Sequence, residues 1–581
     1  MKEFFKMAFA TVVGLMIFAF ALFFLSASVV GALMSASEAE VSVKPNSVFH
    51  LKLGGVLTER AEENSLHFLM GTLNDSQKTI GLDEILKGIR TASENANIEG
   101  IYLDCDPSFS ASPAALLEIR NALMQFKKTG KFVVSYSDTY SQGNYMVASV
   151  ADSVLLNPYG HLMITGLSMR TVFVKDLLDK LGIKMQVVKV GTYKSAVEPY
   201  INTSMSDANR LQLNALSNSI WTNYRFVIAP SRQVMPAVFD EFADNGTFLQ
   251  DASEAVALHL VDSLVYRNEM ETILEHLTAS DEVELINLKQ MMHVKTVEKY
   301  SKNKVAVLYA NGEIDGNDES GMDSEKITKE LLKLADDDNV KCVVLRVNSR
   351  GGSAYGSEQM WHATTVLKAK KPLIVSMGGY AASGGYYMSC AADVIVAQPN
   401  TITGSIGIFG LFPNVQGLTQ KLGVNFDGVK TNKLSDFGDF SRPLTATENA
   451  LLQQYINEGY ETFVKRCADG RKMSIDSIKA IGEGRVWSGI EAERLGLVDA
   501  IGGLDTAIAI AIEKAELTDY MIKEYPAKKD ILAELMEEFS SIKVNMLKET
   551  LGNDYTYYHY AEQVKNSCGM QARLPFLLEL N

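Results

Sequence analysis

Residues 371 to 399 read KPLIVSMGGYAASGGYYMSCAADVIVAQP, an apolar run that ends in a glycine-rich turn followed by small residues. Residues 131 to 158, KFVVSYSDTYSQGNYMVASVADSVLLNP, match this segment with a single gap. Three further pairs keep nearly the same separation along the chain: 96–107 with 338–349, 164–166 with 402–404, and 258–264 with 495–501. An internal repeat decides how a chain is divided. The sequence therefore predicts two copies of one unit, at 47–295 and 300–520.

Each copy alternates short runs rich in Val and Ile with longer amphipathic segments. KVAVLYA (304–310) and CVVLRV (342–347) are runs of the first kind, and EKITKELLKLADD (325–337) is a segment of the second kind. Strands that are apolar throughout are buried on both faces, as in a parallel sheet covered by helices. The predicted fold class is α/β. Residues 521–581 are expected to form a helical tail, because apolar residues recur at helical spacing in 530–551.

The N-terminal segment is apolar over an unusual length. Met7 to Ser37 contains no charged residue, and the leader 1–6 before it carries two lysines and one glutamate. About 20 apolar residues span a bilayer, whereas the apolar part of a cleaved signal needs only about 7 to 15. A retained transmembrane signal anchor over 7–37 is predicted, with cleavage near Ala36 as the alternative. The positive leader places the N-terminus in the cytoplasm and the bulk of the chain outside.

The composition excludes several classes of function. The formal net charge of the 581 residues is −15, which argues against sequence-independent nucleic-acid binding, since that requires a basic face. The five cysteines include no C-x-x-C pair, so neither a zinc site nor a disulfide framework is indicated. No metal or organic cofactor is expected.

Two glycine-rich turns follow apolar strands in the second copy. Gly351 and Gly352 come after CVVLRV, where an unshielded backbone N–H can face a developing oxyanion. Ser383 lies where the strand PLIVSM gives way to a helix, as a nucleophile elbow requires. A hydroxyl that attacks and donors that hold the negative oxygen are the requirements of acyl transfer. The pair of turns therefore predicts a serine nucleophile.

A serine hydroxyl needs an adjacent base, and histidine does not supply one nearby. None of the eight histidines lies between residues 363 and 558. The repeat offers another base. The first copy has Gln142 where the second has Ser383, and it has Phe109 and Ser110 in place of the glycine pair. The nucleophile and its glycines are thus present in only one copy.

The first copy carries a lysine that the second copy lacks. Lys194 lies in VVKVGTYKSAVEPYI (187–201), and Ser435 occupies the corresponding position of the second copy. Burial lowers the pKa of a lysine toward the working pH, which allows the amine to act as a general base. We therefore expect one copy to supply the base, Lys194, and the other to supply the nucleophile, Ser383.

Four motifs together resemble one peptidase family. AASGGYY (381–387), TGSIGIFG (403–410), NSRGGS (348–353) and GTYKSAVEP (191–199) are similar to the long form of signal peptide peptidase A, also called protease IV. The similarity extends from the anchor to about residue 520. This resemblance implies tandem Clp/crotonase-like ββα domains after the transmembrane helix. The family usually has proline where this chain has Arg350.

The resemblance also implies an activity and a set of site residues. It implies a serine–lysine endopeptidase that is anchored by a single span in the bacterial cytoplasmic membrane, with its catalytic part on the periplasmic side. Its substrates would be cleaved signal peptides and other apolar peptides, and its assembly a homotetramer. Ser383 would be the nucleophile and Lys194 the base. Gly352 and Gly384 would form the oxyanion hole, and Gly351 and Ser405 would support the site.

Two other classes of function remain open at this stage. A crotonase-like acyl-CoA enzyme can share the scaffold, but it would work with carboxylates near the glycine turns and has no use for an outward-facing catalytic part. A catalytically silent membrane scaffold would be indifferent to the loss of Ser383. The chemistry of the Ser383 hydroxyl separates these alternatives from a peptidase.

Overall fold

The computed structural model describes residues 40–61, 79–295, 300–316, 321–527 and 569–573, with five single positions between residues 6 and 20. Apart from four of those single positions, the predicted anchor at 7–37 lies outside the described residues. The segment 530–551, expected to be helical, also lies outside them. Within the described residues, no helix combines the length and apolar character that a bilayer crossing needs.

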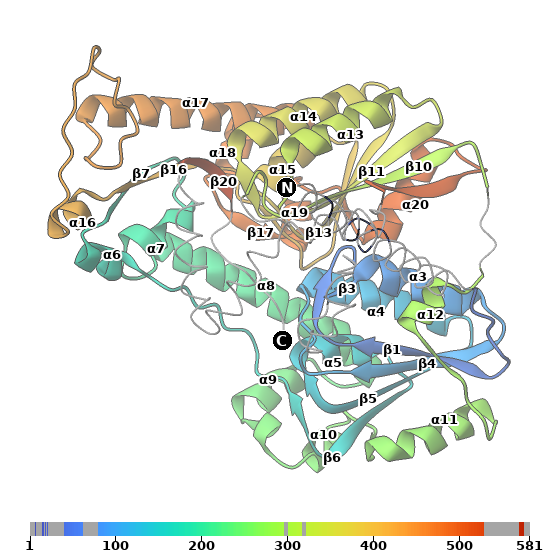
Figure 1. Cartoon of the computed structure of the whole chain (residues 1–581). Helices are drawn as coiled ribbons and strands as arrows, with labels where there is room; N and C mark the ends of the chain where they lie inside the picture. Colours follow the sequence, from blue (N-terminus) through green and yellow to red (C-terminus); the bar gives the residue numbers. More distant parts are fainter. Residues whose placement is uncertain are drawn as a thin grey trace.

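The first half of the chain is built on a six-stranded parallel sheet in the order β8-β6-β5-β4-β1-β9 (Figure 1). The strands of the first half are β1 (Ser47–Leu53), β2 (Val56–Thr58), β3 (Thr79–Gly81), β4 (Ile98–Cys105), β5 (Phe132–Ser141), β6 (Ser153–Met163), β7 (Lys184–Lys189), β8 (Ser263–Leu264) and β9 (Leu285–Asn287). Of these, β2, β3 and β7 lie outside this sheet. Its helices are α3 (Leu82–Glu94), α4 (Pro113–Lys127), α5 (Gln142–Ala148), α6 (Lys175–Leu181), α7 (Glu198–Ile201), α8 (Asp207–Arg232), α9 (Ala237–Asp244), α10 (Ser253–Ala257), α11 (Met270–Thr278) and α12 (Leu288–Met292), with short 3-10 helices η2 (Ser195–Val197), η3 (Thr247–Leu249) and η4 (Arg267–Glu269).

The second half repeats this plan around an eight-stranded sheet. Its path is β17-β15-β13-β11-β10-β19, and off this path β14 pairs with β13 and β18 pairs with β14. The strands of the second half are β10 (Lys304–Asn311), β11 (Val340–Ser349), β12 (Gly351–Ser353), β13 (Leu373–Ala382), β14 (Val394–Ala397), β15 (Ile402–Gly404), β16 (Phe409–Asn414), β17 (Val486–Ser488), β18 (Ala500–Ile501), β19 (Met521–Tyr525) and β20 (Gly569–Arg573), of which β12, β16 and β20 lie outside this sheet. Its helices are α13 (Ser324–Asp336), α14 (Ala354–Lys368), α15 (Gly384–Ser389), α16 (Gln416–Lys421), α17 (Ala446–Arg471), α18 (Ile475–Ile481), α19 (Gly489–Arg494) and α20 (Leu504–Lys514).

The two halves share internal contacts as well as element order. Tyr145 donates its hydroxyl to Leu260 O in the first half, and Tyr386 does the same to Leu497 O in the second. The carboxylates of Asp152 and Asp393 each accept from the backbone N–H of the preceding strand, at Val133 and Leu373. Arg232 pairs with Asp262 as Arg471 pairs with Asp499. The repeat seen in the sequence is therefore a repeat of structure.

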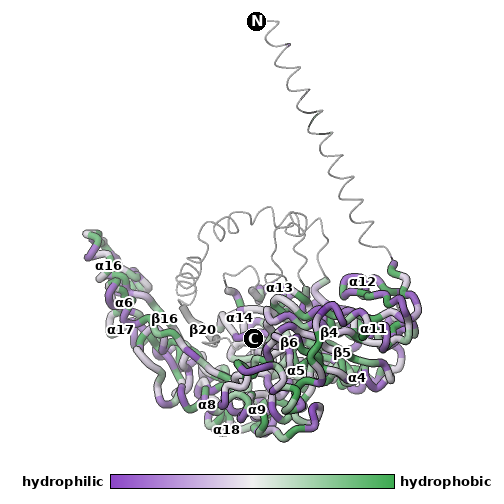
Figure 2. Tube along the Cα trace, turned by 90° about the horizontal axis from the view of Figure 1, so that it is seen from below, coloured by the Kyte–Doolittle hydropathy of each residue, from purple (hydrophilic) through white to green (hydrophobic). Residues whose placement is uncertain are grey.

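A third sheet joins the halves. Strand β7 of the first half pairs antiparallel with β16 of the second, and the order continues through β20 to β12. The long helices cross in the same way: α8 packs on β17, and α17 packs on β7. Figure 2 shows that α6, α16, α17 and β16 form an arm that projects from the body of the molecule. Because β7 pairs with a strand of the second half, the loop that follows β7 also lies against the second half.

A buried ion cluster also links the halves. Arg346 on β11 is fully buried, and its guanidinium donates to Glu59 Oε2 (2.8 Å), to Glu118 Oε1 (2.6 Å) and to Ser376 Oγ (2.9 Å). Glu118 lies on α4, which packs between the first sheet and β13 (Figure 1). The other carboxylate oxygen of Glu118 accepts from Leu504 N (3.1 Å). The interface between the halves therefore contains two carboxylates that form ion pairs with one guanidinium.

The end of the chain differs from the expected helical tail wherever it is described. Met521 to Tyr525 form β19, which pairs in parallel with β10 and extends the second sheet. Gly569 to Arg573 form β20, which lies between β12 and β16. Apolar residues at helical spacing predict a helix only where the pattern occurs, and neither strand belongs to the segment 530–551 that shows it. The extension of the second sheet also goes beyond the expected boundary at residue 520.

Candidate active site

Ser383 occupies a strained bend between β13 and α15. Its φ of +56° is in a region that residues with a side chain rarely adopt. Its N–H donates to Gly404 O (2.8 Å), and its carbonyl accepts from Tyr387 N (2.8 Å). A Cβ at Gly385 would lie 2.7 Å from Ser349 O, so only glycine permits this close packing against β11. The surroundings fix the bend, and the expected elbow is present.

Lys194 reaches Ser383 from the other half of the chain. It follows β7 in the loop that begins at Gly191, and it is 1% exposed. Its Nζ lies 2.7 Å from Ser383 Oγ, 3.0 Å from Ser405 Oγ and 3.1 Å from Ser405 O. The structure therefore brings together three of the residues that the sequence singled out, across the seam between the copies.

Burial sets the protonation of this amine. Desolvation lowers the pKa of Lys194 from 10.5 to about 7, and it is the only cause of the shift. A neutral amine has two hydrogens, which match the two Ser405 oxygens, and one lone pair, which is left for the Ser383 hydroxyl proton. The geometry thus suits proton transfer from Ser383 Oγ to Lys194 Nζ.

A pH dependence of turnover follows from this lowered pKa. The ammonium form cannot accept a proton, so kcat/KM for peptide hydrolysis is expected to rise with pH through about 7 and to level off above it. Initial rates at substrate concentrations well below KM, measured from about pH 5.5 to about pH 9, give this profile. A rate that is constant between pH 6 and pH 8 would contradict the assignment of Lys194 as the base.

The glycine pair lies beside the elbow. Strands β11 and β13 are paired with Ser349 opposite Ala381, so the turn after β11 adjoins the end of β13. Gly352 has φ +152°, and a Cβ there would lie 2.2 Å from Ile314 O. Gly384 is the first residue of α15, where backbone N–H groups have no partner within the helix. Gly352 thus lies in the turn that adjoins the end of β13, and Gly384 directly follows Ser383.

Arg350 occupies the place of the usual proline in this turn. Its guanidinium lies over the ring of Tyr380, 4.7 Å from the ring centroid. Tyr380 is on β13, and its N–H donates to Asn348 Oδ1 (3.0 Å). The turn is therefore attached to β13 by a stacked side chain and by a hydrogen bond.

A second-half loop that the sequence did not single out closes over Lys194. Tyr193 N donates to Glu483 O (2.9 Å), and Gly484 N donates to Ile406 O (2.8 Å). Gly484 has φ +78°, and a Cβ there would lie 2.6 Å from Lys194 Cβ and 2.7 Å from Lys194 N. The glycines of 482–484 were the available signal in the sequence. The Lys194 loop that they contact lies nearly 300 residues earlier in the chain, which is about twice the length of a common domain. Nearness in sequence therefore could not indicate this contact.

Gly484→Ala is expected to displace Lys194. The added methyl meets backbone and Cβ atoms rather than the end of a flexible side chain, so the Lys194 loop must move. A misplacement of about 1 Å can cost about 100-fold in rate. We expect a loss of kcat of that order, measured on a fluorogenic peptide. The control is Gly246→Ala, another left-handed glycine but one whose added Cβ meets no atom within 4 Å. Equal activities of the two variants would contradict this close packing.

In the first half, the carboxamide of Gln142 occupies the position that corresponds to Ser383. Gln142 Oε1 accepts from Thr165 N (3.1 Å) and Gly166 N (3.0 Å), and its Nε2 donates to Gly166 O (3.2 Å). Ser435, which stands where a second lysine would be expected, lies in an exposed loop beyond α16. The duplicated site therefore has neither a nucleophile, because Gln142 replaces it in the first half, nor a base, because Ser435 replaces it in the second half.

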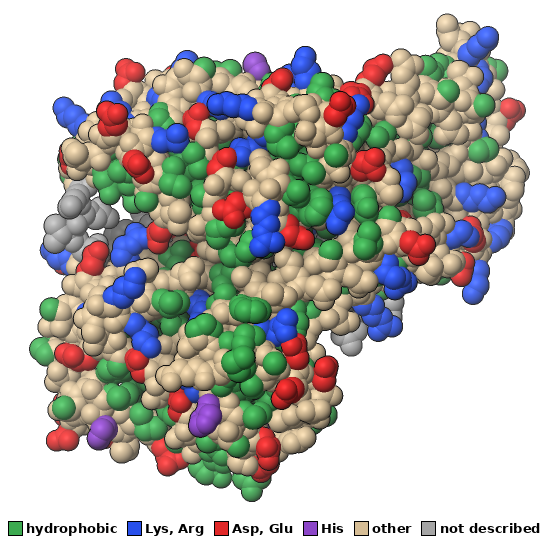
Figure 3. Space-filling model, turned by 180° about the vertical axis from the view of Figure 1, so that it is seen from behind, with side chains coloured by type: hydrophobic (Ala, Val, Ile, Leu, Met, Phe, Trp, Pro, Cys, Tyr) green, Lys and Arg blue, Asp and Glu red, His purple; other side chains and the backbone are tan. Residues whose placement is uncertain are grey.

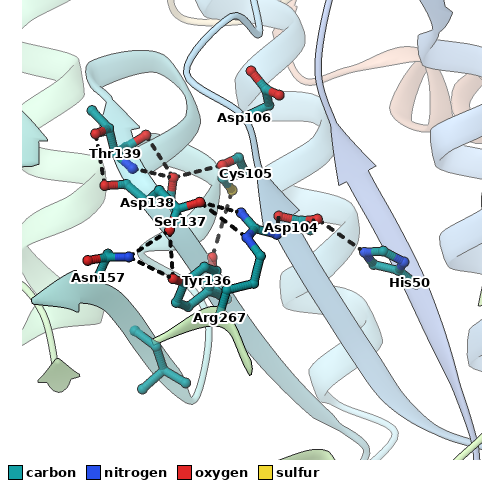
Figure 4. Close-up of polar contacts among 12 residues, drawn as sticks. His50, Asp104, Cys105, Asp106, Tyr136, Ser137, Asp138, Thr139, Asn157 and Arg267 are labelled. Carbon is teal, nitrogen blue, oxygen red and sulfur yellow. Dashed lines mark hydrogen bonds and ion pairs between the residues drawn. The ribbon is translucent and has the colours of Figure 1, made fainter. Parts of the chain in front are cut away.

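A histidine–aspartate pair lies elsewhere in the first half (Figure 4). His50 Nε2 is 3.3 Å from Asp104 Oδ2, and Arg267 binds both Asp104 and Asp138. The nearby Ser137 Oγ lies 2.7 Å from Cys105 O and 2.7 Å from Thr139 O, so its one proton is directed to a backbone carbonyl. These contacts describe an ion-pair cluster at the end of β4 rather than a serine–histidine pair.

Comparisons with known proteins show which family the chain resembles. The pattern of Peptidase family S49 matches residues 125–281 and 365–518, and that of Clp protease matches residues 297–402. The chain is 34% identical to "Protease 4" of Salmonella typhi, over 86% of this chain and 84% of that protein. It is 36% identical to "Protease 4" of Haemophilus influenzae, over 82% and 80%. It is 28% identical to "Serine protease SPPA, chloroplastic" of Arabidopsis thaliana, over 87% and 76%.

Proposed function

The chain belongs to Peptidase family S49 and is a serine-type peptidase of the signal peptide peptidase A family, and from this premise we propose its chemistry and its substrates. We propose a membrane-anchored endopeptidase that degrades signal peptides and similar apolar peptides with a Ser383–Lys194 dyad. One observation carries the proposal: the buried Lys194 Nζ lies 2.7 Å from Ser383 Oγ.

The dyad accounts for both halves of a peptide hydrolysis. Neutral Lys194 takes the proton of Ser383 as Oγ bonds to the scissile carbonyl carbon, and the amides of Gly352 and Gly384 hold the oxyanion. Each such donor is worth about 3 kcal/mol of the barrier. The C–N bond then breaks, and the Lys194 ammonium protonates the leaving amine. Water, deprotonated by Lys194, attacks the acyl-enzyme, and Ser383 recovers its proton. Ser405 keeps the amine in place throughout.

The strand next to Gly351 and Gly352 supports an extended substrate. The described residues 569–573 form an antiparallel strand between β12 and β16, so a chain in extended form fits beside the glycine turn. Main-chain pairing of this kind gives affinity, and alternate side chains give specificity. Phe409 and Leu411 on β16 belong to a buried apolar cluster with Val197. We infer that the neighbouring subsites take apolar side chains.

The anchor and the assembly are proposed on separate grounds. The uncharged run from Met7 to Ser37 is long enough to hold the protein in the bacterial cytoplasmic membrane, with its catalytic part on the periplasmic side. The projecting arm exposes several large apolar side chains beyond α16, among them Leu422, Val429 and Phe440. An exposed apolar surface of this kind is typical of a protein contact. We propose that it contacts a second copy in a homotetramer, and that each subunit has two domains, the first at 47–295 and the second beginning at 300 and including β19 beyond residue 520.

The face of the molecule seen in Figure 3 gives no reason to propose another class of partner. Figure 3 shows acidic and basic side chains interspersed over the face that it presents, without a continuous basic patch. Together with the net charge of −15, this favours a peptide over a nucleic acid as the ligand. The proposed chemistry requires no metal or organic cofactor.

The proposed function is tested by peptide selectivity. The full chain in detergent is supplied with a synthetic peptide that has an apolar core like that of a signal peptide, and with a peptide of equal length whose core alternates Lys and Glu. We expect cleavage within the apolar core and at least about tenfold slower cleavage of the charged peptide, since each buried apolar side chain contributes about 1.5–3 kcal/mol. Hydrolysis of acyl-CoA without peptide cleavage would favour the crotonase alternative, and no turnover of either would favour the scaffold.

A further inference from the structure

The Lys194 loop depends on a side chain that touches neither the amine nor the nucleophile. Gln212 lies on α8 and is 1% exposed. Its Nε2 donates to Tyr193 O (3.0 Å) and to Ser195 Oγ (3.1 Å), the residues on either side of Lys194. Its Oε1 accepts from Val486 N (3.3 Å) in the second half of the chain. One carboxamide thus joins both flanks of the base to β17.

The contact at Val486 leads directly to the nucleophile. Strand β17 pairs with β15, and Val486 stands opposite Gly404. Gly404 O accepts from Ser383 N (2.8 Å), and the next residue, Ser405, contacts Lys194 Nζ. A chain of hydrogen bonds therefore runs from the Lys194 loop through Gln212 and two paired strands to Ser383.

The orientation of the Gln212 carboxamide is determined by its partners. Val486 N is a donor and Tyr193 O is an acceptor, so a flipped amide would place like groups together at both ends. Asn209 Oδ1 (3.1 Å) is a further acceptor on the Nε2 side. Because the group is buried, loss of these bonds leaves polar atoms unsatisfied. The loop carrying Lys194 would then loosen and admit water.

We propose that Gln212 is a positioning residue for the reaction, which holds Lys194 against Ser383 by joining the loop of the base to the strand beside the nucleophile. This inference rests on the proposed function of the dyad. The effect on catalysis is indirect: water at a loosened loop restores solvation of the ammonium, and the pKa of Lys194 rises toward its ordinary value. A structural role alone would lower stability and leave the pH dependence of Ser383 reactivity unchanged.

The test is the pH dependence of covalent labelling in the full chain. The second-order rate of inactivation by a fluorophosphonate reports activation of Ser383 without a peptide substrate. The variant Gln212→Met keeps the length of the side chain and removes its hydrogen bonds. The matched control is Ser219→Ala, which removes the other hydrogen bond from α8 to β17, between Ser219 Oγ and Ser488 Oγ (2.7 Å). Ser219→Ala should leave the profile where it is in the unmodified protein.

For Gln212→Met we expect the rise of the labelling rate with pH to move up by about one pH unit, so that labelling is about fivefold slower at pH 7, about tenfold slower well below pH 7, and recovers above about pH 9. A second variant, Gln212→Glu, keeps the shape but sets a carboxylate beside the base, and it should move this rise at least as far. If the labelling rate rises over the same pH range in both variants as in the unmodified protein, the inference is overturned while the dyad remains intact. A wild-type profile with no rise that depends on Lys194 would instead overturn the proposed function.

Discussion

Ser383→Ala is expected to lower peptide turnover by about 10⁴-fold or more, because the acyl-enzyme cannot form without the hydroxyl. Lys194→Ala should cost nearly as much, since Ser383 Oγ has Lys194 Nζ as its contact for proton transfer at 2.7 Å. Residues that act as one unit are strongly non-additive. The double variant should therefore be no slower than the slower single variant, as measured by kcat/KM on one peptide.

The control for this prediction is a buried serine outside the site. Ser137→Ala removes a fully buried hydroxyl whose contacts are with backbone in the first half. It should leave kcat/KM within about twofold of the unmodified protein, in keeping with the near-independence of distant sites. Losses in the two single variants that multiply in the double variant would show that Ser383 and Lys194 act separately, against the dyad.

Arg346→Met is expected to have the largest effect on stability. The substitution leaves Glu59 and Glu118 buried without the guanidinium that neutralises them. Burial raises the pKa of Glu118, and the attraction of Arg346 opposes this shift. Breaking one partner out of a buried ion pair costs about 3–5 kcal/mol. We expect a loss of that size in the free energy of unfolding, read from the midpoint of a urea titration at neutral pH.

The two carboxylates provide the control for that prediction. When Glu59→Gln and Glu118→Gln are added to Arg346→Met, the cluster carries no charge, and much of the lost stability should return. Acidification should also help the single variant, because protonation removes the uncompensated charge. An Arg346→Met protein as stable as the unmodified one at neutral pH would show that these charges do not contribute to the seam between the halves.

The sequence predicted the parts of the fold that local pattern controls. The apolar runs at 304–310 and 342–347 are strands β10 and β11, and the alternation with helices gave the α/β class. The turn at Ser383 was predicted because a strand, glycines and a helix follow one another within a few residues. Comparison of the copies identified Lys194, since a residue present in only one copy is visible without any structure.

Contacts between distant segments could not be predicted in this way. Gln212 is one polar residue on a long helix, and its role depends on Tyr193 and on Val486, which lies far along the chain. The glycines at 482 and 484 did not indicate that Gly484 would lie on Lys194. Strand β20 depends on pairing with β12 and β16, which no local periodicity encodes. Each of these features arises from tertiary packing of segments that are remote in sequence.

The site of covalent labelling tests most directly whether one amine and one hydroxyl, from different copies of the repeat, form a single site. The protein is treated with a fluorophosphonate at a pH at which the labelling rate no longer rises with pH. It is then digested, and the labelled residue is identified by mass spectrometry. We predict an adduct on Ser383 in the unmodified protein and none above background in Lys194→Ala. An adduct on another serine, or equal labelling of Ser383 with and without the Lys194 amine, would contradict the account.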